Sequence, residues 1–124
     1  MTIDEYFDAL RQTLAAMPIV IQQSLVFRDS GIDTGFVKGD LLLLQEHRLY
    51  VAEYVLMTPI FTRRKYRFHL QDAANRLVLR WDNAPHHPHL STFPHHCHRQ
   101  DGEVVASAPM DLPSVLDAIT PLLA

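Results

Sequence analysis

The sequence has one cysteine, no long apolar run and no large excess of either charge. A single cysteine among 124 residues excludes an internal disulfide and fits a reducing compartment. No apolar run approaches the length that spans a bilayer, and the acidic N-terminus lacks the basic and apolar regions of a signal peptide. A formal net charge of -3 gives no general attraction to nucleic acid, although it leaves room for a local basic patch. A cytoplasmic protein without membrane contact is therefore expected.

What is present is the composition of a globular protein. Hydrophobic residues make up 48% of the chain and charged residues 20%, which is not the composition of a disordered chain. The length suits one domain with a modest core. Residues 1–124 are therefore expected to form a single domain.

Both ends of the chain carry helical patterns. Thr2 and Glu5 have the spacing of a capping box, and the apolar residues that follow recur at helical spacing until Pro18. Near the C-terminus, Asp111 can cap a second helix that has Pro113 in its first turn. Each helix has one apolar stripe, which should face the core.

Between these helices the sequence has the patterns of strands. Strand-like segments occupy residues 19–27, 36–44, 48–57 and 103–107, and residues 64–83 alternate around a turn at 72–75. The order is an N-terminal helix, a five- to six-stranded mostly antiparallel sheet and a C-terminal helix. This order predicts an α+β fold with both helices on one sheet face.

The 64–83 hairpin has a preferred register, because its apolar residues must share one face. The expected pairs are Leu70 with Leu77, Phe68 with Leu79 and Tyr66 with Trp81. On the polar face, Arg67 then lies opposite Arg80, and Lys65 lies opposite Asp82.

Two opposed arginines repel each other, so an anion is expected beside Arg67 and Arg80. Asp82 and Glu53 are the candidates within the chain. A phosphate is the candidate outside it, because the planar arginine fork binds phosphate well.

The stretch from Trp81 to Arg99, "WDNAPHHPHLSTFPHHCHR", contains six of the eight histidines and the only cysteine. Three interpretations remain open: a zinc site, an acid-base site, and a polar loop held extended by its prolines. The spacing matches no standard zinc motif. If a metal binds at all, the expected ligands are Asp82, His96 and His98; no other cofactor is expected.

An acid-base site of this composition suits RNA cleavage, which needs a base, an acid and a cation for the phosphate. Arg67 and Arg80 would hold the phosphate, and Asp82 would orient a histidine. The candidates for proton transfer are His69, His87, His96 and His98.

The histidines of this stretch should not be equivalent. Side chains alternate in extended segments, so His96 and His98 share a side and His95 lies on the other. Prolines stiffen the path of the loop as it leaves the Arg80–Asp82 strand. We expect His87, His96 and His98 to point toward the arginines, whereas His86, His89 and His95 are mostly exposed.

"YRFHLQD" followed by "RLVLRWDNAPHHPHLSTFPHHCH" resembles the TumE family of bacterial and archaeal toxins. The family pattern is a Tyr-Arg-aromatic-His strand, an Arg-aromatic-Asp-Asn strand end and a loop that ends in His-His-x-His. The matching residues are Tyr66 to His69, Arg80 to Asn83, His86, His87, His95, His96 and His98. The family commonly has a basic residue where Cys97 stands, which argues against a thiol mechanism.

This resemblance implies the toxin of a type II toxin-antitoxin pair, encoded beside a DNA-binding antitoxin with a helix-turn-helix. A homodimer is a further candidate assembly. The leading hypothesis is a metal-independent endoribonuclease with RNA as its substrate. The alternatives are a metal-dependent nuclease and a non-enzymatic module that binds through its histidine-rich loop.

Overall fold

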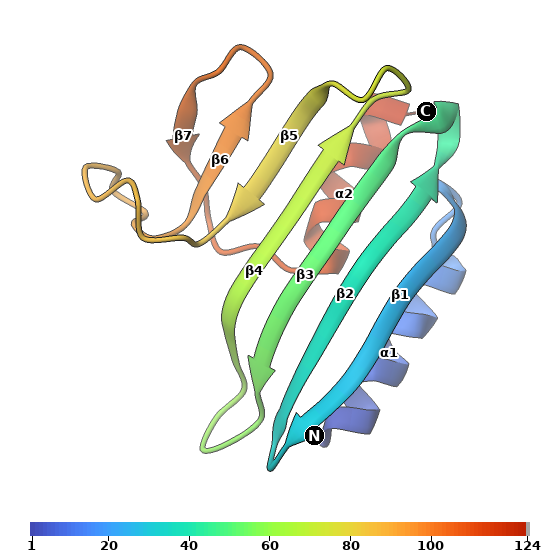
Figure 1. Ribbon diagram of the computed structural model, residues 1–124, viewed down its shortest axis with the longest axis vertical. Helices are drawn as coiled ribbons and strands as arrows, with labels where there is room; N and C mark the ends of the chain where they lie inside the picture. The colour runs from blue at the N-terminus through green and yellow to red at the C-terminus, as the bar shows by residue number, and fades with distance from the viewer. Residues whose placement is uncertain (124) are drawn as a thin grey trace.

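The computed structural model describes residues 1–123 as one sheet with two helices (Figure 1). Helix α1 (Ile3–Ala16) comes first and helix α2 (Leu112–Leu123) comes last. The strands are β1 (Val20–Gly31), β2 (Thr34–Leu43), β3 (Arg48–Leu56), β4 (Thr62–Gln71), β5 (Leu77–Asp82), β6 (His96–Arg99) and β7 (Val104–Ala106), with a short 3-10 turn at Leu44–Glu46. Within the described residues, no helix combines the length and apolar character needed to cross a membrane.

The seven strands form one antiparallel sheet in sequence order, and both helices lie on the same face of it (Figure 1). The predicted α+β architecture is confirmed, but the predicted count of five or six strands is wrong. The additional strand is β6, inside the histidine-rich stretch. It has no alternating apolar pattern, because its His96 and His98 face polar partners on β5 and only Cys97 turns toward the core.

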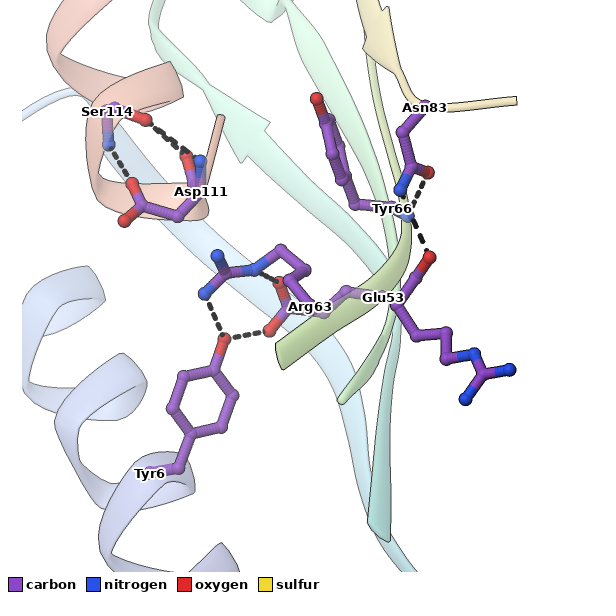
Figure 2. Close-up of polar contacts among 8 residues, drawn as sticks. Tyr6, Glu53, Arg63, Tyr66, Asn83, Asp111 and Ser114 are labelled. Carbon is purple, nitrogen blue, oxygen red and sulfur yellow. Dashed lines mark hydrogen bonds and ion pairs between the residues drawn. The ribbon is translucent and has the colours of Figure 1, made fainter. Parts of the chain in front are cut away.

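The core lies between the helices and the sheet. Apolar residues of α1, α2 and every second position of β2 to β5 are buried there, as strand alternation requires. The predicted caps are present: the Thr2 hydroxyl accepts from the Glu5 amide, and the Asp111 carboxylate accepts from the Ser114 amide (Figure 2). Within residues 1–123 no helix covers the opposite face, which we call the open face.

The register of the β4–β5 hairpin differs by two residues from the prediction. Phe68 pairs with Trp81 and Leu70 with Leu79, whereas Arg67 lies opposite Asp82 and His69 opposite Arg80. A register shift between Leu70 and Gln71 leaves Val78 as an extra residue in β5. The shift of two keeps Phe68, Leu70, Leu79 and Trp81 on the core face, whereas Leu77 pairs with Gln71. It also replaces the predicted Arg67–Arg80 repulsion with an attractive pairing.

Glu53 does not lie near these arginines, contrary to the prediction, because it points to the helix side of β3. Its carboxylate accepts a hydrogen bond from the Tyr6 hydroxyl and another, at 2.8 Å, from Arg63 Nε (Figure 2). Arg63 also donates to the Tyr6 oxygen at 3.1 Å. Burial and the adjacent Glu53 carboxylate raise the pKa of Tyr6. This network ties α1 to β3 and β4.

Candidate active site on the open sheet face

The candidate residues lie in two rows that cross the open face. Paired residues on antiparallel strands share a face, so each row can be followed from strand to strand. The Asp82 row contains Val26, Lys38, Ala52, Arg67, Asp82 and His96. The Arg80 row contains Ser24, Asp40, Tyr50, His69, Arg80 and His98. The structure therefore places six of the seven predicted site residues side by side on β4, β5 and β6.

Asp82 is the centre of this cluster and is only 4% exposed. Its Oδ1 lies 2.9 Å from His96 Nε2 and accepts a hydrogen bond from the Ala84 amide. Its Oδ2 lies 3.3 Å from His98 Nε2 and 3.3 Å from Arg80 Nε. A buried carboxylate needs such partners, because burial without them is costly.

His96 is 2% exposed and has an oxygen atom beside each ring nitrogen. Its Nδ1 bonds the Pro94 carbonyl oxygen at 2.8 Å, and its Nε2 faces Asp82. His96 is too deeply buried to touch a substrate, which makes it a positioning residue for Asp82.

His98 and His87 are the imidazoles next to His96 that can reach a substrate. His98 is half-buried; burial lowers its pKa, and the Asp82 carboxylate opposes this change. Within residues 1–123, its Nδ1 makes no hydrogen bond. Desolvation and the neighbouring imidazoles lower the pKa of His87. Both rings are therefore mainly neutral at pH 7 and able to accept a proton.

His87, the seventh predicted residue, comes from the loop between β5 and β6. Its ring centroid lies 4.7 Å from that of His96 and 5.8 Å from that of His98. The loop therefore folds back toward the sheet and completes a group of three imidazoles above Asp82.

The cations of the site border a groove of about 820 Å³. Arg67, Arg80, Asp82 and Asn83 are among its lining residues. Arg67 is exposed, and the buried Arg80 Nε has no hydrogen-bond acceptor within the described chain, since its N–H is not directed at Asp82. Burial and the charges of Arg80 and Arg67 lower the pKa of His69. Such a groove suits an anion.

The sequence model of the family described as "Toxin TumE" matches residues 9–124. The chain belongs to the TumE toxin family. No match is found among curated proteins or among solved structures.

The histidine-rich loop of this TumE chain is held by bonds that sequence reasoning did not anticipate. The Asn83 side chain accepts from the Tyr66 amide at 3.0 Å and donates to the Arg64 carbonyl oxygen (Figure 2). Tyr66 in turn bonds His95, with 2.8 Å between its hydroxyl and Nδ1. His95 is therefore half-buried, so its predicted exposure is wrong, whereas His86 and His89 are exposed as predicted. In the sequence, the Asp82-Asn83 pair at the end of β5 was the signal from which these bonds could have been predicted.

Three imidazoles of this TumE site are close enough to hold a metal ion. One nitrogen of each of His87, His96 and His98 lies within 4.8 Å of the others. This set differs from the predicted Asp82, His96 and His98, because His87 takes the place of the carboxylate. His96 could ligate only after giving up the Pro94 carbonyl or Asp82, so the fit is incomplete.

Cys97 takes no part in this cluster. It pairs with Trp81 and is buried on the core side of the sheet, on the face opposite the imidazoles. Burial raises the pKa of its thiol. A raised pKa makes a thiolate scarce, so Cys97 is a poor nucleophile or ligand.

Proposed function

We propose that this TumE-family toxin is a cytoplasmic endoribonuclease that works without a metal ion. The observation that carries this proposal is the buried carboxylate of Asp82, which contacts His96, His98 and Arg80 at the edge of a groove lined by Arg67 and Arg80. A carboxylate that orients an imidazole is a common device for acid-base catalysis.

The proposed reaction is attack of an RNA 2′-oxygen on the adjacent phosphorus. His98, held at Nε2 by Asp82, accepts the 2′-hydroxyl proton at Nδ1. Protonated His87 gives a proton to the departing 5′-oxygen, so that the products are a 2′,3′-cyclic phosphate and a 5′-hydroxyl. Arg67 and Arg80 stabilise the charge that develops on the phosphate oxygens. His69 lies beside both arginines and can contact the same phosphate.

A toxin of this kind requires a partner that neutralises it. We propose a DNA-binding antitoxin with a helix-turn-helix, encoded beside the toxin. It would protect the producing cell by covering the groove or by holding the loop away from the sheet.

The test is incubation of purified, untagged protein with total RNA in excess chelator, followed by mapping of the RNA ends. Reproducible cuts with cyclic phosphate ends are expected from the wild type. Asp82→Asn and Arg80→Ala should strongly reduce them, whereas the exposed-loop control His89→Ala should keep them. Absence of cuts by the folded wild-type protein would leave the non-enzymatic binding module as the better account.

A metal-dependent nuclease is the second candidate, favoured by the spacing of His87, His96 and His98. Its test is elemental analysis of untagged protein for zinc, manganese and nickel. A stoichiometric ion that is lost in His87→Ala, with cleavage lost in chelator, would favour this candidate over the first.

A further inference from the structure

The open face carries cations well beyond the candidate active site. A third row, the Phe36 row, contains Arg28, Phe36, Tyr54 and Lys65. Together with Lys38 and Arg67 of the Asp82 row, the face has four basic side chains that form no ion pair within residues 1–123. These four are Arg28, Lys38, Lys65 and Arg67.

The carboxylates of the same rows are already paired. Asp40 forms an ion pair with Arg48, and Asp82 is engaged by Arg80 and two histidines. Of the other acidic residues, Asp4, Glu5, Asp8 and Asp117 lie on the helices, which cover the opposite face (Figure 1). The chain has a net charge of -3, yet its open face has an excess of unpaired positive charge. Such a local patch attracts polyanions.

Aromatic rings lie among these cations. Phe36 is 44% exposed and Tyr50 is 40% exposed, although large apolar rings are usually covered. The Phe36 and Tyr54 rings are neighbours on β2 and β3, with centroids 4.7 Å apart. Tyr50 lies beside His69, with ring centroids 6.2 Å apart. Exposed rings interleaved with cations are the combination that binds single-stranded nucleic acid, because bases stack on the rings while the cations hold the phosphates.

The rings and cations are continuous with the active site. The groove that contains Arg80 and Asp82 is also lined by Phe36, Lys38 and Tyr54. Along the Asp82 row, Lys38 is three strands from Asp82, and neighbouring strands are about 4.8 Å apart. A chain of nucleotides bound at Lys38 can therefore extend along the groove to Arg80 and Asp82.

We propose that the open face of β1 to β4 is a platform for single-stranded RNA that leads the substrate to Asp82. Phe36 and Tyr54 stack on bases, and Lys38, Lys65 and Arg28 contact phosphates. This inference rests on the proposed ribonuclease function and adds the path and the strandedness of the substrate. A duplex is a poorer occupant, because its bases are already stacked and cannot lie on the rings.

The experiment measures binding separately from cleavage. A fluorescein-labelled 2′-O-methyl RNA of mixed sequence lacks the attacking hydroxyl, so it binds but cannot be cut. Its affinity is measured by fluorescence anisotropy for the wild type, Phe36→Ala, Tyr54→Ala and Lys38→Gln. The matched control is Arg76→Gln, which removes one charge from the exposed β4–β5 turn. Thermal unfolding of each variant verifies that it remains folded.

Each aromatic variant should bind about 5- to 150-fold more weakly than the wild type, which is the usual effect of losing one stacked base. Phe36→Tyr should restore binding. Lys38→Gln should reduce the salt dependence of log affinity by about 0.7, the value for one single-strand phosphate contact. The Arg76→Gln control should leave both quantities unchanged.

Three results would overturn the platform. They are failure of the wild type to bind this RNA, equal binding by the aromatic variants, and binding of the matching duplex or an acidic peptide as tight as that of the single strand. Failure of the proposed function has a different signature. If the aromatic variants lose binding but the wild type cuts no natural RNA, the platform stands and the nuclease does not.

Discussion

Asp82 and His96 are paired residues of β5 and β6, and His96 Nε2 lies 2.9 Å from Asp82 Oδ1 at a place where both side chains are buried. This contact holds Oδ1 of the Asp82 carboxylate, while Oδ2 faces His98 and Arg80. The same contact joins a short strand of polar sequence to the main sheet. This interaction therefore contributes both to the stability of this edge of the sheet and to the order of the site.

His96→Ala should lower the free energy of unfolding by about 3 kcal/mol, because the buried Asp82 carboxylate loses one of its partners. Cleavage and growth arrest should be lost with it. Denaturant titration measures the stability change, and His89→Ala in the exposed loop serves as the control. A fully stable and fully toxic His96→Ala protein would contradict the positioning role.

Glu53→Gln should destabilise the protein without changing any side chain on the open face. Glu53 is buried and holds Arg63 and Tyr6, so the neutral amide leaves Arg63 without its counter-charge. The expected loss is about 3–5 kcal/mol by denaturant titration. The exposed Asp8–Arg11 pair on α1 supplies the control, because Asp8→Asn should leave the unfolding midpoint unchanged. Equal unfolding midpoints for the two variants would show that the network of Glu53, Arg63 and Tyr6 contributes little to stability.

Arg80→Lys should reduce RNA cleavage about 100-fold while keeping the charge, as when one preorganised donor to a transition state is removed. A lysine cannot present two parallel N–H groups to a phosphate. The measurement is kcat/KM on a short RNA substrate, with Arg76→Lys in the turn as the control. Unchanged kcat/KM would place Arg80 outside the reaction and leave it a partner of Asp82 only.

The helices and their ends could be predicted from the sequence because they depend on local spacing. Thr2 with Glu5, and Asp111 with the residues after it, form caps within one turn of chain. The hairpin register depends on more distant features. Alternation fixes only which face a residue occupies, so it could not distinguish the predicted partners of Phe68 and Leu70 from the observed ones, which are displaced by two residues. The extra residue Val78 accounts for one residue of this displacement, because Leu77 pairs with Gln71.

The residues of the site could be predicted from the sequence, but the interactions that hold them in place could not. Alternation placed His96 and His98 on one side, and pairing with β5 put that side over Asp82. Strand β6 was missed because its burial comes from polar contacts, which no apolar pattern reveals. The Tyr66–His95 bond that anchors the loop joins residues 29 positions apart, and only the folded chain brings them together.

The pH dependence of RNA cleavage should be bell-shaped, because the proposed mechanism needs one neutral and one protonated imidazole. Cleavage becomes faster as the pH rises through the pKa of His98, because only the neutral ring can accept a proton. Cleavage becomes slower as the pH rises through the pKa of His87, because only the protonated ring can donate a proton. Both pKa values are lowered from the ordinary 6.5, so the maximum should lie below pH 6.5.

Asp82→Asn should move that maximum to still lower pH, because the Asp82 charge raises the pKa of both His98 and His87. Removing the charge disfavours protonation of each ring, so both limbs of the profile shift in the acidic direction. The measurement is kcat/KM against pH for the residual activity of the variant, with Asp117→Asn on helix α2 as the control. A maximum above pH 7 for the wild type, or an Asp82→Asn profile that is lower but unshifted, would show that these imidazoles do not transfer the protons.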